Sequence, residues 1–191
     1  FNRDAAVQSV NRYMQDGSRA PEGTLMVIDL DNFKEINDTK GHLFGDSVLT
    51  EAARCIAGVF DSQDMVGRIG GDEFLVFSKQ LSGREEIMKR GRQLIEDIAG
   101  LPSVKKSGSK PSCSIGAAVY PADGSTYEQL FLKADMALYA GKNWGKGRCV
   151  VYDSSLRPAD SGKHIQGRFT DGTMIDSENG RYFVTNKVIH Y

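Results

Sequence analysis

The sequence predicts an α+β domain in which helices cover the faces of a mixed β-sheet. Two observations support this class. Predicted strands and helices alternate along most of the chain, which is typical of helices packed on a sheet. Two of the predicted strands flank the short stretch G-G-D-E and form a hairpin, which adds an antiparallel pair to the sheet. We therefore expect the sheet to be mixed rather than wholly parallel.

The first half of the chain contains a helix, a strand, two further helices and the hairpin. Thr24–Leu30 is a continuous apolar run of strand length, which is typical of a central strand covered on both faces. From Val48 to Phe60, apolar residues recur every three or four positions and indicate an amphipathic helix. Its expected cap is Asp46 or Ser47. The remaining elements predicted here are a helix at Asn2–Met14, a short helix that ends at Gly41, and strands at Met65–Ile69 and Phe74–Phe77.

The second half continues with a helix, a strand, a long helix and a last strand. Apolar spacing defines both helices, and the first of them ends at a glycine. The strand C-S-I-G-A-A-V-Y carries one glycine in its interior. The predicted bounds are Ile87–Ile98 before Gly100, Cys113–Tyr120, Tyr127 to about Lys142, and Arg148–Tyr152.

The character of the chain changes after residue 152. The stretch D-S-S-L-R-P-A-D-S-G-K is polar and is broken by proline and glycine, as in a linker. The residues beyond it are rich in β-forming types, and no helix is predicted among them. We expect residues 1–152 to form one domain, and residues 153–191 to form a linker and the beginning of a truncated further element.

Composition narrows the classes of partner. The formal net charge of −1 provides no basic surface for nucleic acid or for direct membrane contact. No apolar run approaches the roughly 20 residues that a membrane span requires. The opening F-N-R-D-A-A-V has no signal peptide. The three cysteines lack metal-ligand spacing and are expected to be buried thiols in a reducing compartment. We expect a cytoplasmic fragment of a longer protein, which has sensor or effector domains and possible membrane anchoring elsewhere.

Acidic residues end or follow predicted strands at three positions. Asp29 and Asp31 lie at the end of M-V-I-D-L-D, and Asp72 lies on the hairpin turn. If the hairpin is next to the first strand, Asp29 and Asp72 converge and repel each other unless a cation intervenes. Carboxylates with room for water and phosphate suit Mg²⁺ or Mn²⁺, and a pair of such ions promotes nucleotidyl transfer. The structural alternative is that Asp29 caps the next helix and that Gly70–Glu73 is an ordinary turn.

Glycines and lysines stand where a nucleotide would need them. Gly70 and Gly71 together let the backbone approach a bulky ligand. Lys142 and Lys146 follow the last long helix, where they either favour the helix dipole or neutralise a triphosphate. The backbone amides of Asn32, and of Phe33 after it, open a short helix, and such a helix start binds phosphate readily.

Four ordered sequence blocks resemble the GGDEF family of diguanylate cyclases. The family signature is matched by G-G-D-E-F, its first block by D-L-D-N-F-K-E-I-N-D-T-K-G-H-L-F-G-D, its late strand by S-I-G-A-A, and its closing helix by A-D-M-A-L-Y-A-G-K-N-W-G-K. The similarity spans residues 1 to about 152, with the family's opening motif truncated at F-N-R. It implies a palm-like βαββαβ core with a mixed, mostly antiparallel sheet. It also implies the condensation of two GTP molecules to cyclic di-GMP with release of pyrophosphate, in a homodimer of GGDEF domains.

The resemblance gives roles to individual residues. Asp29, Asp72 and the backbone carbonyl of Leu30 would bind Mg²⁺ or Mn²⁺, two ions per active site. Glu73 would orient or deprotonate the reacting 3′-hydroxyl. The expected GTP-binding residues are Asn37 and Asp46 at the guanine edge, Gly70 and Gly71 against the nucleotide, and Asn32, Phe33, Lys34, Lys142 and Lys146 around the phosphates. The acid at Asp46 favours two guanines over a mixed product, and Lys146 replaces an arginine that is usual in the family.

The sequence departs from the family at the inhibitory product site. The family has R-x-x-D shortly before its signature, whereas this chain has D-S-Q-D. Asp64 retains the acid of that motif, but Asp61 replaces the arginine. Because a second acid repels the phosphates of the product, we predict weak or absent feedback inhibition through this site.

A second hypothesis for the function remains open beside the cyclase. The domain would bind GTP without turning it over and would regulate a neighbouring domain, such as a phosphodiesterase. A third possibility is a pure protein-interaction platform, but such a domain usually has an eroded signature. The intact G-G-D-E-F argues against that third possibility.

Overall fold

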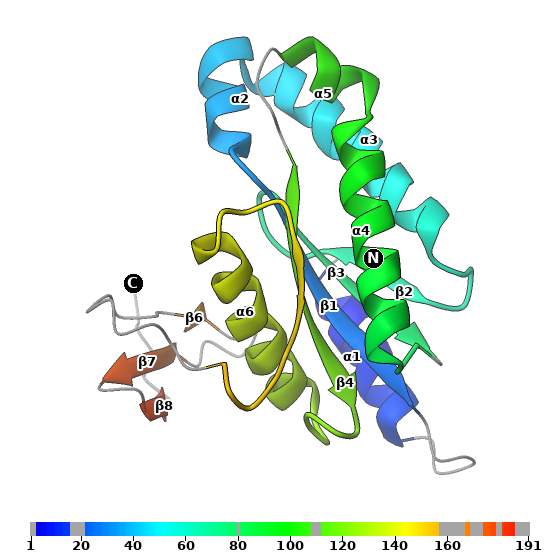
Figure 1. Cartoon of the computed structure of the whole chain (residues 1–191), viewed down its shortest axis with the longest axis vertical. Helices are drawn as coiled ribbons and strands as arrows, with labels where there is room; N and C mark the ends of the chain where they lie inside the picture. The colour runs from blue at the N-terminus through cyan, green and yellow to red at the C-terminus, as the bar shows by residue number, and fades with distance from the viewer. Residues whose placement is uncertain are drawn as a thin grey trace. The chain divides into compact units, whose positions relative to one another are not determined.

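The chain divides into two compact units, residues 1–153 and residues 154–191. The structure is a computed structural model that describes residues 3–15, 22–79, 81–107, 112–156, 167–168, 174–178 and 181–185. Figure 1 shows the elements of both units. In the second unit, the described strands β6 (Gly167–Arg168), β7 (Met174–Glu178) and β8 (Arg181–Thr185) form an antiparallel sheet in that order. The predicted domain boundary and linker stay predictions, and much of the linker lies outside the described residues.

A five-stranded sheet forms the centre of the first unit, in the order β2-β3-β1-β4-β5. Strand β1 (Gly23–Leu30) lies in the middle and is antiparallel to both β3 (Glu73–Lys79) and β4 (Cys113–Tyr120). At the edges, β2 (Met65–Arg68) is antiparallel to β3, and β5 (Cys149–Val151) is parallel to β4. The sheet is therefore mixed and mostly antiparallel, which confirms the predicted fold class.

Helices cover both faces of this sheet, and β1 supplies residues to both faces. Leu25 and Val27 belong to one apolar cluster, whereas Met26 and Ile28 belong to the other. All eight residues of β1 are buried, as expected for a central strand. The first cluster is completed by α1 (Arg3–Gln15) and α6 (Tyr127–Asn143), and the second by α2 (Phe33–Lys40), α3 (His42–Val59), α4 (Arg84–Ala99) and α5 (Pro102–Ser107), which Figure 1 shows together.

Helix α6 packs closely on β4 because this strand carries Gly116. A Cβ atom at Gly116 would overlap the carbonyl oxygen of Ala134 and the backbone nitrogen of Leu138. The glycine that interrupts the strand pattern thus lets the backbone of the strand contact the backbone of the helix. This close packing fixes α6, and with it the lysine near its end, relative to the central strands.

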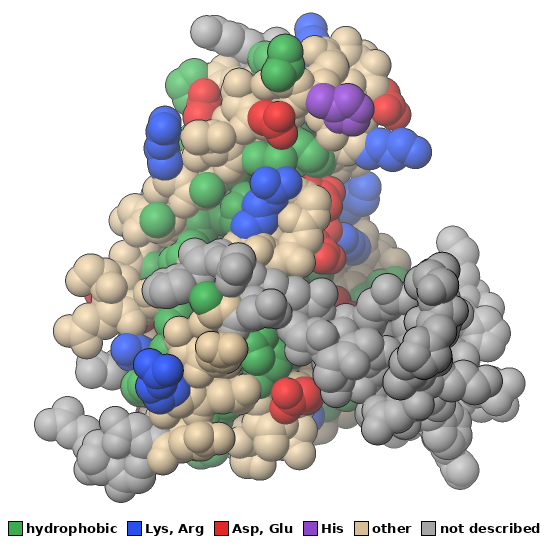
Figure 2. Space-filling model, turned by 180° about the vertical axis from the view of Figure 1, so that it is seen from behind, with side chains coloured by type: hydrophobic (Ala, Val, Ile, Leu, Met, Phe, Trp, Pro, Cys, Tyr) green, Lys and Arg blue, Asp and Glu red, His purple; other side chains and the backbone are tan. Residues whose placement is uncertain are grey.

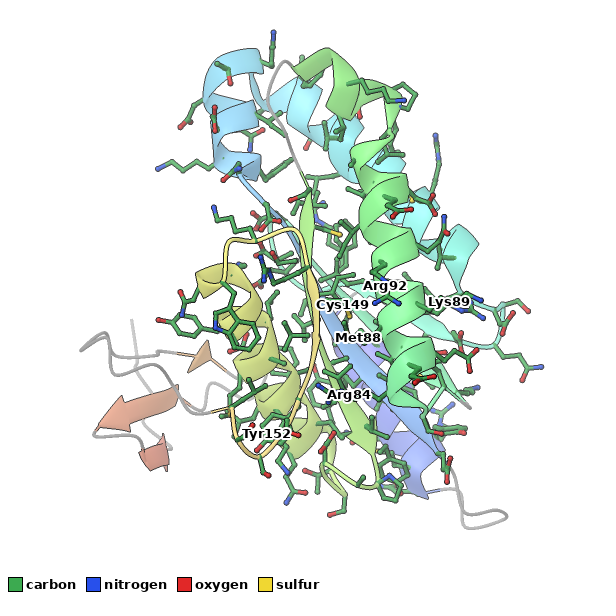
Figure 3. The ribbon with its side chains drawn as sticks, viewed as in Figure 1. Arg84, Met88, Lys89, Arg92, Cys149 and Tyr152 are labelled. Carbon is green, nitrogen blue, oxygen red and sulfur yellow. The ribbon has the colours of Figure 1, made fainter. Side chains whose placement is uncertain are left out.

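Helix α4 covers the edge strand β5 through a second close approach. A Cβ atom on Gly91 would overlap the side chain of Cys149. Figure 3 shows Cys149 beside α4, near Met88 and Arg92. Burial raises the pKa of the Cys149 thiol to about 12, and the charge of Arg92 opposes this rise. Cys149 is therefore a neutral buried thiol, as predicted. Cys113 is also buried, whereas Cys55 is only half-buried.

Two local predictions differ from the structure. Helix α3 begins at His42, so Asp46 and Ser47 lie inside the helix and the predicted cap is wrong. The reason is Gly41, whose φ of 83° turns the chain directly from α2 into α3. The short helix α5 has no counterpart among the predicted elements, because six residues are too few to show a helical period. No described helix is long and apolar enough to cross a membrane.

Candidate active site

A pocket with a volume of about 670 Å³ opens at the end of β1. In the upper right of Figure 2, acidic and basic side chains lie close together on this part of the surface. The pocket combines residues from β1, α2, the hairpin turn and the end of α6. Its lining includes eight of the residues predicted from the sequence, namely Asp29, Leu30, Asn32, Phe33, Lys34, Asp72, Lys142 and Lys146. We call it the phosphate-side pocket.

The pairing of β1 with β3 brings the two predicted metal-binding acids together. Asp29 lies opposite Glu73 in the antiparallel register, so Asp72 comes next to the end of β1. The backbone N–H of Leu30 donates a hydrogen bond to the carbonyl oxygen of Asp72 at 3.2 Å. Asp29 and Asp72 therefore line one pocket, as the sequence predicts, while their role as metal ligands stays a prediction.

Asp29 has opposing electrostatic neighbours. Its Oδ2 atom lies 2.7 Å from the Nζ atom of Lys142. Burial raises the pKa of the Asp29 carboxyl above its usual value, the hydrogen bond and charge of Lys142 lower it, and the charges of Asp72 and Glu73 raise it. Two neighbouring acids and one lysine thus act on the charge of Asp29 at the end of β1. Such a site favours an additional positive charge.

The oxygen atoms of this site fit a divalent cation. Asp29 and Asp72 offer carboxylates, and Leu30 offers a backbone carbonyl, which are the ligands that Mg²⁺ and Mn²⁺ prefer. Within the described ranges, no group of three or more His, Cys, Asp or Glu residues could enclose a metal ion. Water and phosphate oxygens would therefore have to complete the coordination, as is usual for Mg²⁺ beside a nucleotide.

The glycine turn is held in place by Arg68, which the sequence analysis did not single out. The guanidinium donates to the carbonyl of Gly70 at 3.1 Å and to that of Gly71 at 2.7 and 3.1 Å. A Cβ atom on Gly70 would lie 2.7 Å from a carboxylate oxygen of Glu73, so this glycine leaves room for that acid. A Cβ atom on Gly71 would meet nothing within 4 Å, which leaves the turn open on that side.

Asn37 and Asp46 both lie outside the phosphate-side pocket. A Cβ atom on Gly45 would overlap the Oδ1 atom of Asn37, which places this amide against the residue before Asp46. Among the described residues, this Oδ1 is the one buried side-chain oxygen or nitrogen without a hydrogen-bond partner. Asp46 lines a second cavity of about 610 Å³ together with residues of α3 and β2. The structure thus places Asn37 against Gly45 and Asp46 in a separate cavity, and their joint binding of guanine stays a prediction.

Lysines reach the phosphate-side pocket from two directions. Lys34 lies on the first turn of α2, and Lys146 follows α6. The Nζ atom of Lys146 donates to the Oδ1 atom of Asn32 at 2.8 Å, so the loop after α6 contacts the start of α2. Glu35, Asp38 and Thr39 also line this pocket and were not predicted, because their polar types on an exposed helix face carry no distinct signal.

Asp64 of the predicted inhibitory motif is engaged within the protein. Its Oδ1 atom accepts from the backbone N–H of Lys79 at 2.8 Å, and its Oδ2 atom accepts from Ser78 Oγ at 3.0 Å and from the N–H of Asp61 at 3.1 Å. These bonds fasten the loop before β2 to the end of β3. The prediction of weak product inhibition stays a prediction.

The fold and this pocket define a palm-like α+β domain with acids and lysines around a nucleotide-sized pocket. Residues 1–148 match the model of the family described as diguanylate cyclase, GGDEF domain. The chain belongs to this family, which confirms the resemblance predicted from its motifs. Domains of this family bind GTP, occur in multidomain proteins, and as cyclases generally depend on a divalent metal.

Individual relatives and structures agree with this assignment. MucR of Pseudomonas aeruginosa, named a bifunctional diguanylate cyclase/cyclic di-GMP phosphodiesterase, is 32% identical over 155 residues, or 80% of this chain and 22% of MucR. The cyclic di-GMP phosphodiesterase PdeR of Escherichia coli is 33% identical over 159 residues, or 81% of this chain and 23% of PdeR. The solved GGDEF domain of TpbB from Pseudomonas aeruginosa has a TM-score of 0.74 and 31% identity, covering 81% of this chain and 91% of that chain. This chain thus spans less than a quarter of either curated relative.

Proposed function

We propose that this chain condenses two GTP molecules to cyclic di-GMP with release of pyrophosphate. The observation that carries the proposal is the pocket at the end of β1, which is lined by Asp29 and Asp72 together with Lys34, Lys142 and Lys146. Nucleotidyl transfer requires acidic side chains that bind divalent metal ions. It also requires basic side chains that bind a triphosphate. The intact signature in a chain of this family supports the same reaction.

Asp29, Asp72 and the Leu30 carbonyl would hold two Mg²⁺ or Mn²⁺ ions. Such ions offset the negative charge of the triphosphate and make the 3′-hydroxyl more acidic. Glu73 lies opposite Asp29 in the sheet register but is not among the residues that line the pocket. In this proposal its carboxylate accepts the proton of the attacking 3′-hydroxyl, the 3′-oxygen forms a bond to the α-phosphorus of the other GTP, and the bond between its α- and β-phosphates breaks to release pyrophosphate.

Lysines and the buried amide would bind the rest of the substrate. Lys34, Lys142 and Lys146 would neutralise the triphosphate from two sides of the pocket. Guanine carries N–H donors on one edge, and the carboxylate of Asp46, which lines a separate cavity, would offer acceptors to such an edge. Because the Oδ1 atom of Asn37 is buried against Gly45, its amide would have to turn outward to contact guanine.

The reaction joins two nucleotides, and each domain has one such site. Two domains would therefore have to face each other, each presenting its GTP to the other, as a homodimer does. The concentration of the chain then limits the rate. Sensor or effector domains attached elsewhere in a longer protein would control this encounter.

A second function is favoured by one observation. PdeR, of which 23% is similar to 81% of this chain, is named a phosphodiesterase rather than a cyclase. In this alternative the domain binds GTP without condensing it and changes the activity of a neighbouring domain.

The test separates the two functions. Concentrated protein is incubated with GTP and Mg²⁺, cyclic di-GMP is quantified by chromatography, and GTP binding is measured in parallel with a non-hydrolysable analogue. The cyclase predicts product from the wild type, and a loss of about 10²–10⁴-fold for Glu73→Gln, which removes the proton acceptor and keeps its shape. Lys89→Ala on α4 is the matched control and should keep full activity. Binding without product would support the regulatory alternative, and no binding at all would contradict both.

A further inference from the structure

The loops on either side of the phosphate-side pocket share an unusual backbone. Asn32, at φ 60°, and Lys146, at φ 61°, are the described non-glycine residues with positive φ. This left-handed conformation is uncommon for a lysine, and it persists only where neighbouring contacts enforce it. The two residues contact each other through Lys146 Nζ and Asn32 Oδ1. Some group must therefore hold these loops together.

Asp31 lies between the two loops and is only 2% exposed. Its Oδ2 atom accepts from the backbone N–H of Gly147 at 3.0 Å and from Ser112 Oγ at 2.6 Å. Its Oδ1 atom accepts from Ser114 Oγ at 2.8 Å. Its own N–H donates to the carbonyl of Ser112 at 2.8 Å. One side chain thus connects the end of β1, the start of β4 and the loop after α6.

These bonds distinguish Asp31 from its neighbour Asp29. Both oxygens of Asp31 face donors that belong to the protein, and a buried carboxylate keeps its charge only with such donors. Asp29, by contrast, faces a lysine whose long side chain can move away. Although Asp31 borders the pocket, its charge is directed at the loop after α6 rather than at a ligand.

We infer that Asp31 is a positioning residue for phosphate recognition. By holding Gly147 it keeps the preceding Lys146 in its left-handed conformation, so that the lysine ammonium stays beside the first turn of α2. Asp31 itself does not touch the substrate. The inference rests on the proposed function and deepens it, because it names the residue that holds the loop with Lys146 in the position where this lysine would bind the triphosphate.

The first experiment compares Asp31→Asn with the matched control Ser114→Ala. The control removes a bond to the other oxygen of Asp31 and leaves the bond to Gly147 in place. Dissociation constants are measured for a non-hydrolysable GTP analogue and for guanosine. Asp31→Asn should weaken GTP binding about tenfold and guanosine binding less than about twofold, because only the phosphate contacts depend on this loop. Ser114→Ala should change both by less than about twofold. Equal weakening of GTP and guanosine by Asp31→Asn would mean a merely structural role and would overturn the inference.

A double-mutant cycle tests whether Asp31 acts through Lys146. Lys146→Ala should lower GTP affinity by about as much as Asp31→Asn, and the double variant should show no further loss. Additive losses would overturn the inference, since Asp31 would then act by another route. All titrations are run below the melting temperature of each variant, which keeps a loss of folding apart from a loss of binding.

Hydrogen exchange separates this inference from the proposed function. In the absence of nucleotide, the Gly147 amide should exchange faster in Asp31→Asn than in the wild type, and Ser114→Ala should leave it protected. If the wild type does not bind GTP yet the amide behaves in this way, the proposed function fails while the anchoring of the loop stands. If the amide exchanges at the same rate in all three proteins, the inference fails whatever the protein binds.

Discussion

Single acidic residues divide into two groups that look alike in the sequence. Asp31 and Asp64 direct their oxygens at donors within the protein, whereas Asp29 and Asp72 face the pocket. The sequence predicts the convergence of Asp29 with Asp72, because a hairpin beside a central strand leaves few other arrangements. It does not separate Asp31 from Asp29, since the serines and the glycine that bind Asp31 lie more than 80 residues away along the chain.

Replacement of Asp64 should lower stability, because its carboxylate is bonded within the protein. Asp64→Ala removes the acceptor for the N–H of Lys79 and the hydroxyl of Ser78, so we expect a loss of about 1–3 kcal/mol in the free energy of unfolding. Asp61→Ala is the control, because this side chain is exposed and its removal should change stability by less than about 0.5 kcal/mol. Urea denaturation measures both. Equal stabilities of the two variants would contradict the structural role of Asp64.

The pH dependence of stability should reveal the raised pKa of Asp135 on α6. Burial raises the pKa of its carboxyl above the usual 3.8, with Lys142 lowering it and Asp29 raising it. The folded protein then holds this proton more tightly than the unfolded chain, so stability falls as pH rises from about 3.8 through the folded-state pKa. The side chain of Asp135→Asn cannot ionise, so the free energy of unfolding of this variant should fall less steeply with pH. Urea denaturation of both proteins between about pH 4 and 7 provides the measurement, and parallel curves would contradict the assignment.

Elements follow the hydrophobic pattern closely where they are long and less closely where they are short. The eight buried residues of β1 and the apolar stripes of α3, α4 and α6 are evident in the sequence, because burial imposes their periods. The pattern does not reveal α5, and it places the start of α3 too late. A glycine with positive φ at position 41 determines that start, and backbone conformation leaves no trace in hydrophobic spacing.

The contact of α6 with β4 should depend on Gly116. Gly116→Ala forces a Cβ atom against backbone atoms of Ala134 and Leu138, which cannot move unless the whole helix shifts. We expect a loss of about 1–3 kcal/mol in the free energy of unfolding. Gly58→Ala on α3 is the matched control, because its Cβ atom would meet nothing within 4 Å, and it should be neutral or stabilising by up to about 1 kcal/mol. Thermal denaturation compares them. Similar melting temperatures for the two variants would show that the helix is not held this closely.

For the molecule as a whole, the fold brings four separate stretches of sequence to one pocket. The end of β1, the start of α2, the hairpin turn and the loop after α6 all contribute, and their motifs allowed the site to be predicted in outline. The separation of Asn37 and Asp46 from the phosphate-side pocket could not be predicted, because it depends on how α2 packs against Gly45. Arg68 was missed for a similar reason, since its partners are backbone carbonyls, which the sequence does not distinguish.

The most direct test of the proposed chemistry is Mn²⁺ binding in the presence of a non-hydrolysable GTP analogue, followed by electron paramagnetic resonance. If Asp29 and Asp72 hold the ions, Asp29→Asn and Asp72→Asn should each weaken Mn²⁺ binding by more than about tenfold. Asp38→Asn, which removes another acid of the same pocket, should change it by less than about threefold. Mn²⁺ binding that is unchanged in both Asp29→Asn and Asp72→Asn would contradict the proposed metal site and the cyclase built on it.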